Sequence, residues 1–149
     1  MGLEKIIMEA IKTAMKEKNQ QALAALRAVK SELILLKTSG SLSELNETDE
    51  NKILQKLVKQ RKDSASIFSE QNREDLAIPE LEQAEIISRF LPKQMSENEV
   101  EIVVVEIISK TGANSMKDMG KVMGLTNSQL AGKADGKTIS GIVKKMLSN

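Results

Sequence analysis

The chain has 149 residues, with 22 Lys and Arg against 21 Asp and Glu, so its formal net charge is +1. It contains no Cys, His, Trp or Tyr and only two Phe. These absences exclude disulfides, thiolate nucleophiles, Cys-based zinc sites and catalysis with imidazole as the general base. Two Phe residues are also too few for an aromatic platform on which single-stranded nucleic acids could stack.

The composition favours helix. Hydrophobic residues make up 40% of the chain, which is enough for a packed core, and only two Pro interrupt a sequence rich in good helix formers. The N-terminus has no signal-peptide apolar region, and no apolar run approaches the roughly 20 residues that a membrane span needs. We therefore expect a cytoplasmic protein with no membrane association.

Apolar residues at helical spacing predict four helices in the first part of the chain. The first helix begins at Leu3, and the second follows Asn19 and ends in a loop over 37–41. We expect Thr48 to cap the third helix and Pro79 to lie in the first turn of the fourth. The expected apolar stripe of this fourth helix consists of Leu81, Ala84, Ile87 and Leu91.

Three further helices are predicted after Pro92. Ser96 and Glu99 form a capping-box pattern before a segment rich in β-branched residues, whose apolar positions nevertheless recur at helical spacing up to Gly112. Ser115 and Asp135 are the expected caps of the last two helices. The sixth helix should carry its core face on Met116, Met119, Gly120 and Met123. The predicted fold is all-α, with a helical domain of about four helices over 1–92 and a three-helix tail domain over 93–149.

Four segments carry a resemblance to a known family. They are 118–124 (DMGKVMG), 132–137 (GKADGK), 59–64 (KQRKDS) and 90–96 (FLPKQMS). In these segments the chain resembles the GatB/YqeY domain family and the stand-alone YqeY-like proteins. The resemblance covers essentially the whole chain and implies an all-helical protein with a three-helix tail.

The resemblance also implies a functional context. In the B subunit of glutamyl/aspartyl-tRNA amidotransferase the related tail domain helps to engage tRNA, and a related domain is attached to some glutaminyl-tRNA synthetases. The stand-alone proteins share an inherited label, carbon–nitrogen ligase activity with glutamine as amido-N-donor. The catalytic domain of the amidotransferase would not fit beside seven helices in 149 residues. The resemblance therefore favours a tRNA-associated module over an enzyme.

Two glycines and a glycine-rich turn in the tail each allow two interpretations. Gly120 and Gly124 lie four residues apart, and we interpret them as close-packing glycines, the alternative being close approach of an RNA backbone. Residues 131–138 (AGKADGKT) nearly match a phosphate-binding loop, but no buried strand is predicted before them, so we interpret the match as chance. A glycine-rich turn that opens a helix beside Lys133 and Lys137 could still bind one RNA phosphate.

Positive charge is concentrated at the C-terminal end. Residues 112–149 contain six lysines and two aspartates, a net charge of +4, so the other 111 residues carry −3. Such a cluster is typical of a local phosphate footprint, although an ordinary solvated surface is the commoner origin. The RNA-binding candidates are Lys117, Lys121, Lys133, Asp135, Gly136, Lys137, Lys144 and Lys145. A second, weaker group of cations, interpreted by default as paired with nearby acids, is Lys56, Lys59, Arg61 and Lys62.

We therefore expect a non-catalytic, tRNA-associated accessory protein whose tail contacts the shape and phosphates of tRNA. One alternative is an interaction module that docks onto an aminoacyl-tRNA synthetase or an amidotransferase. Another is a carbon–nitrogen ligase with glutamine as amido donor. No residue pattern predicts a catalytic residue, a metal site or a cofactor.

Overall fold

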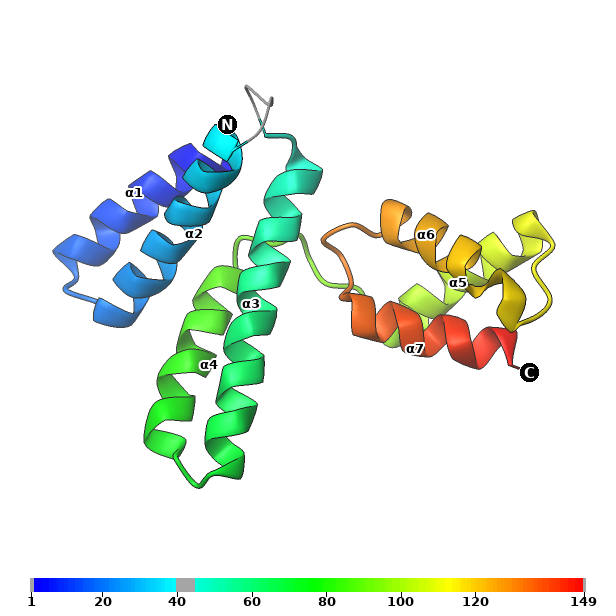
Figure 1. Cartoon of the computed structure of the whole chain (residues 1–149). Helices are drawn as coiled ribbons and strands as arrows, with labels where there is room; N and C mark the ends of the chain where they lie inside the picture. Colours follow the sequence, from blue (N-terminus) through cyan, green and yellow to red (C-terminus); the bar gives the residue numbers. More distant parts are fainter. Residues whose placement is uncertain (1, 40–44, 149) are drawn as a thin grey trace. The chain divides into compact units, whose positions relative to one another are not determined.

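The computed structural model describes residues 2–39 and 45–148, and over these residues the chain is all-α, as predicted. The described residues form seven α-helices and one short 3-10 helix, and they contain no strand (Figure 1). The chain divides into two compact units, Met1–Leu91 and Pro92–Asn149. Their helices are α1 (Leu3–Lys16), α2 (Gln20–Ser39), α3 (Glu47–Glu70) and α4 (Glu74–Ser88) in the first unit, and α5 (Glu97–Thr111), the 3-10 helix η1 (Met116–Asp118), α6 (Met119–Gln129) and α7 (Gly136–Leu147) in the second.

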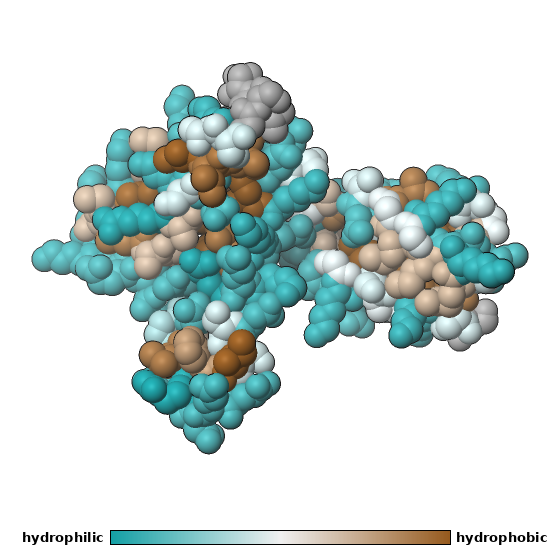
Figure 2. All heavy atoms as spheres, in the orientation of Figure 1, coloured by the Kyte–Doolittle hydropathy of each residue, from teal (hydrophilic) through white to brown (hydrophobic). Residues whose placement is uncertain are grey.

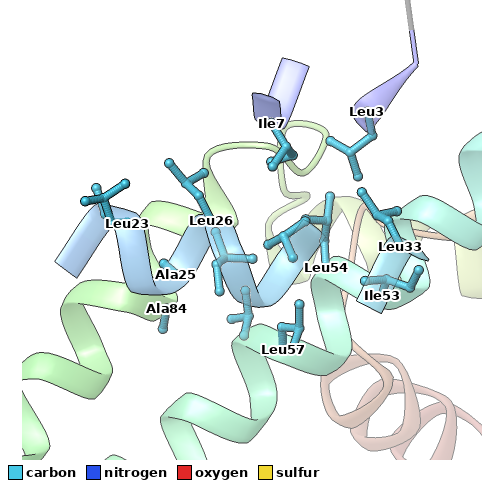
Figure 3. Packing of buried hydrophobic residues seen from close by; sticks show 14 of the residues in the cluster. Leu3, Ile7, Leu23, Ala25, Leu26, Leu33, Ile53, Leu54, Leu57 and Ala84 are labelled. Atoms are coloured by element: carbon cyan, nitrogen blue, oxygen red, sulfur yellow. The ribbon is translucent and has the colours of Figure 1, made fainter. Parts of the chain in front are cut away.

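The first unit is built around α2, which packs against α1, α3 and α4. Its apolar seam recurs at spacings of three and four residues, so that one side of the helix is continuously buried. Ile7, Val29, Leu54 and Ile87, one residue from each helix of this unit, are fully buried in the same cluster. Figure 3 shows how Leu54 and its neighbours on α3 meet the apolar residues of α1 and α2.

Local capping explains where α2 and α3 begin. The Asn19 side chain accepts a hydrogen bond from the Ala22 amide at 3.0 Å at the start of α2. The expected cap of α3 was wrong by two residues. Asn46, not Thr48, is the N-cap, and its Oδ1 accepts from the Asp49 amide at 2.8 Å. An Asn side chain has the short reach that this cap geometry requires, and α3 therefore begins two residues earlier than expected.

α4 differs from its sequence prediction in two respects. Pro79 lies in its second turn, not in its first, because the helix already begins at Glu74. Leu81 is 48% exposed, whereas Ala77, Ala84 and Ile87 form the buried side of the helix. Ala84 and Ile87 of the expected stripe are buried as predicted, but the small Ala77 is buried where Leu81 was expected.

In the second unit, helical periodicity prevailed over the β-propensity of 100–108. Ser96 Oγ accepts from the Glu99 amide at 3.2 Å and caps α5. Gly112 ends the helix in the left-handed conformation, with a φ of 70°. Val100, Val104 and Ile107 are buried along one side of α5, so the helix is fixed by burial of that side rather than by its intrinsic propensity.

The core of the second unit lies between α5, α6 and α7, each of which packs on the other two. The expected core face of the sixth helix was only partly correct, since Met119 and Met123 pack against this core but Met116 and Gly120 do not. Met116 and Gly120 are exposed, Met119 and Met123 are half-buried, and Val122 and Thr126 are the buried residues of α6. The Thr126 hydroxyl donates to the Val122 carbonyl at 2.7 Å, which satisfies the buried polar group. The buried residues from the other elements of this core are Val100, Val104, Ile107, Leu130, Ala134, Ile139, Ile142, Val143 and Leu147.

Candidate nucleic-acid interface

All six lysines of the predicted footprint are exposed. Lys117 lies in η1 and Lys121 in the first turn of α6. Lys133 lies in the turn before α7, and α7 itself carries the remaining three. On α7, Lys137 and Lys144 are seven residues apart, which places them on the same side of the helix. No ion pair within residues 2–39 and 45–148 involves any of the six: Lys117, Lys121, Lys133, Lys137, Lys144 and Lys145.

Cations of the first unit behave differently, since several are paired with acids. Lys56 contacts Glu32 at 3.3 Å and Lys59 contacts Asp63 at 2.7 Å. The Arg61 guanidinium donates to Oε1 of Gln83 at 3.1 Å and to the carbonyl of Leu57 at 3.3 Å. The default interpretation of this second basic group, pairing with nearby acids, is confirmed for Lys56 and Lys59, whereas Arg61 bonds to neutral oxygen atoms. Partners within the protein already use their donors, so they form a weaker candidate for RNA than the tail.

Charge within the second unit is divided by helix. α5 carries four glutamates and one lysine, whereas the span 119–147 carries five lysines and a single acid, Asp135. The unit as a whole therefore has a net charge of only +2, although the α6–α7 part is strongly positive. Within this unit, positive charge therefore lies on α6 and α7 and negative charge on α5, so its electrostatic potential is uneven.

The close-packing interpretation of Gly120 and Gly124 was wrong. Both glycines are exposed, and a Cβ added to either would have no heavy atom within 4 Å beyond the adjoining residues and the helix backbone. Val122 and Thr126 occupy the side of α6 that meets the other helices, so the glycines face away from it. The alternative interpretation, open backbone beside Lys121 that another molecule can approach, is the one that agrees with this geometry.

The start of α7 holds a carboxylate. Asp135 is the N-cap of α7, as predicted, and its Oδ1 accepts from the Thr138 amide at 2.7 Å. This negative charge already complements the positive end of the helix dipole. The exposed Gly136 and Lys137 follow in the first turn. The lysine side chains are therefore better phosphate ligands here than the helix start itself.

The near match to a phosphate-binding loop has no structural counterpart. Such a loop joins a strand to a helix, whereas residues 125–129 form the end of α6 and are followed by a turn. Gly132 has a φ of 80° in this turn. The carbonyl of Gly132 accepts from the Gln94 amide side chain at 2.7 Å, so the turn is held by the linker before α5.

Sequence reasoning missed two polar residues beside the lysines. Asn127 and Ser128 are exposed on α6, and Ser128 lies seven residues after Lys121, on the same side of the helix. The helical period counted from Lys121 would have found Ser128.

Among the described residues there is no group of three or more Asp or Glu side chains that could hold a metal ion. No helix in the described ranges is long and apolar enough to cross a bilayer.

The fold and the distribution of charge define a small all-helical protein with a lysine-bearing three-helix tail. The chain belongs to the YqeY-like protein family, whose sequence model matches residues 4–147. It is also 30% identical over 124 residues to the protein called altered inheritance of mitochondria protein 41, mitochondrial, from Clavispora lusitaniae. That match covers 81% of this chain and 72% of the relative. The family resemblance inferred from the sequence motifs is thereby confirmed.

Proposed function

We propose that this protein is a non-catalytic, tRNA-associated accessory protein whose α6–α7 surface binds the phosphate backbone of folded RNA. The observation that carries the proposal is the set of six exposed lysines on η1, α6, α7 and the turn before α7, none of which forms an ion pair within residues 2–39 and 45–148. Charges that form no intramolecular ion pair remain available for phosphate and release counterions when they bind it. The resemblance of the tail to the amidotransferase B subunit supports tRNA as the RNA.

The chemistry of this surface favours recognition of shape over recognition of bases. Its polar groups are lysine ammonium groups with serine and asparagine beside them, and the chain has no Trp or Tyr to stack on bases. Ammonium groups bind phosphates as point charges and carry little sequence information. The exposed glycines of α6 have no side chains beside Lys121, which lets an RNA backbone come close to the backbone of the helix.

The proposal includes a cytoplasmic location and a working partnership with a tRNA-dependent amidotransferase or an aminoacyl-tRNA synthetase. The relative from Clavispora lusitaniae has a mitochondrial name. Fluorescence of the tagged chain in its own cells would establish the compartment. Signal confined to mitochondria or to a membrane would contradict this part of the proposal.

The test is a tRNA-binding titration of the full chain across a salt series. For a phosphate-driven complex, the logarithm of the association constant falls linearly with the logarithm of the salt concentration. A triple variant with Lys121→Gln, Lys137→Gln and Lys144→Gln should reduce that slope by up to about three units, since each lost phosphate contact contributes about one.

The matched control removes three exposed lysines from the first unit, Lys5, Lys16 and Lys52, again as Lys→Gln. Total charge changes equally in both variants, so a larger effect of the tail variant assigns binding to α6–α7. Equal effects would show non-specific attraction, and no binding of tRNA at low salt would refute the proposal. Conversion of misacylated tRNA by the purified chain with glutamine and ATP alone would replace the proposal by the ligase alternative.

A further inference from the structure

α4 carries apolar residues on two adjoining sides, one buried and one exposed. Ala77, Ala84 and Ile87 are buried against the first unit, whereas Ile78 and Leu81 are 51% and 48% exposed. Ile78 and Leu81 are three residues apart and thus neighbours on the helix surface. Burial of the first set explains why α4 packs on α2 and α3, whereas about half of each side chain in the second set remains exposed.

Acidic residues surround this exposed pair. The helix α4 contains five acids and no base. At 100° per residue, four of these acids fall on the same side of α4 as Ile78 and Leu81, and all four are exposed. We call this side the α4 outward face, and it consists of Glu74, Asp75, Ile78, Leu81, Glu82 and Glu85.

Two of the four acids on the α4 outward face have local partners. Arg73 binds Asp75 at 2.9 Å and Arg89 binds Glu85 at 3.2 Å. Glu74 and Glu82 form no ion pair with any residue in the described ranges 2–39 and 45–148. Figure 2 shows apolar atoms bordered by hydrophilic ones on the hairpin formed by α3 and α4.

We propose that the α4 outward face docks an amphipathic helix of a partner protein, in which an apolar stripe is flanked by Lys or Arg. The apolar pair supplies the buried contact and the surrounding acids select a basic partner, as in other helix-docking surfaces. A second copy of α4 does not fit, because two-fold pairing would oppose the acids of one copy to those of the other. The inference concerns the first unit and does not rest on RNA binding by the tail.

The test uses the full chain and a synthetic helical peptide probe with Leu at positions i, i+3, i+4 and i+7, flanked by Lys. A matched peptide carries Glu in place of each Lys. Binding is measured by fluorescence anisotropy. The Lys peptide should bind and the Glu peptide should not, and raising the salt concentration should weaken the complex.

Two double variants locate the site. Ile78→Gln with Leu81→Gln should weaken binding of the Lys peptide at least tenfold. The control is Ile34→Gln with Leu35→Gln, which alters two exposed apolar residues of α2 and should leave binding unchanged. Circular dichroism confirms that each variant remains helical. A third variant, Glu74→Gln with Glu82→Gln, should reduce the preference for the Lys peptide over the Glu peptide.

Three results would overturn the inference. They are an unchanged affinity of the Ile78/Leu81 variant, equal binding of both peptides by the unaltered chain, and no binding of the Lys peptide at low salt. Light scattering of the unaltered chain covers self-association, and a dimer that the Ile78/Leu81 variant abolishes would assign the face to a second copy instead. Titration of the same variant with tRNA keeps this inference separate from the proposed function, since RNA binding should be unchanged.

Discussion

The backbone amide of Met95 donates to the carbonyl oxygen of Lys133 at 2.8 Å, so two residues 38 positions apart are joined directly. The neighbouring Gln94 side chain donates in parallel to the carbonyl of Gly132 at 2.7 Å. The linker before α5 is thereby fastened to the turn before α7. This attachment closes the second unit and holds Lys133 beside the start of the helix that carries three further lysines.

Replacing Gln94 should loosen this closure. Gln94→Ala removes the donor to the carbonyls of Gly132 and Pro92, and we expect a loss of about 1 kcal/mol in the free energy of unfolding of the second unit. Amide exchange in α7 should then accelerate about fivefold. Gln129→Ala is the control, since that side chain is exposed at the end of α6. Unchanged exchange in α7 would mean that the Met95 bond alone maintains the closure.

Replacing an exposed glycine of α6 should raise the free energy of unfolding, whereas replacing the glycine that ends α5 should lower it. Gly124→Ala should raise the free energy of unfolding by about 0.5–1 kcal/mol, because Ala restricts the unfolded chain and meets no obstacle in the helix. Gly112→Ala should lower it by about 1 kcal/mol, because Gly112 has a φ of 70°. Urea denaturation of both variants measures the difference. A destabilised Gly124→Ala variant would restore the close-packing interpretation.

Core truncation should distinguish the buried from the exposed side of the first unit. Leu54 is fully buried between α1, α2 and α3, so Leu54→Ala should cost about 3 kcal/mol in the free energy of unfolding. Leu35 is 59% exposed on α2, and Leu35→Ala should change stability by less than about 0.5 kcal/mol. Thermal unfolding of the two variants provides the comparison. Similar losses would contradict the packing described for α2.

The ion pair at the start of α4 makes a prediction about pH. The Arg73 guanidinium donates two hydrogen bonds to the Asp75 carboxylate, which lowers the pKa of Asp75 below its usual value. A lowered folded-state pKa means that any stabilisation by this pair is present at neutral pH and is lost as the pH falls through that pKa. An NMR titration of the Asp75 carboxyl should show the depression, and Arg73→Gln should remove it. An unaltered pKa in that variant would show that Arg73 is not the cause.

Local signals in the sequence predicted most of the fold correctly. The apolar repeat of α1 and α7, the Ser96 cap and the Gly112 stop each depend on residues within a few positions of one another, so they can be recognised without tertiary information. The same holds for the Asp135 cap. Errors arose where several local patterns compete, as at Asn46 and Thr48.

The sequence by itself determined the helical class, the concentration of lysines after residue 112 and the family to which the chain belongs. Only the tertiary structure decided which side of each helix is buried. Gly120 and Leu81 fit an inward stripe by period, yet both are exposed, because Val122 and Ala77 are the residues buried against the neighbouring helices instead. The helical repeat of apolar residues shows which residues share a side of the helix. Which of two such sides is buried depends on how closely each packs against helices distant in the sequence. The sides that are not buried include the lysine-bearing surface of α6 and α7 and the α4 outward face, the two surfaces to which we assign a function.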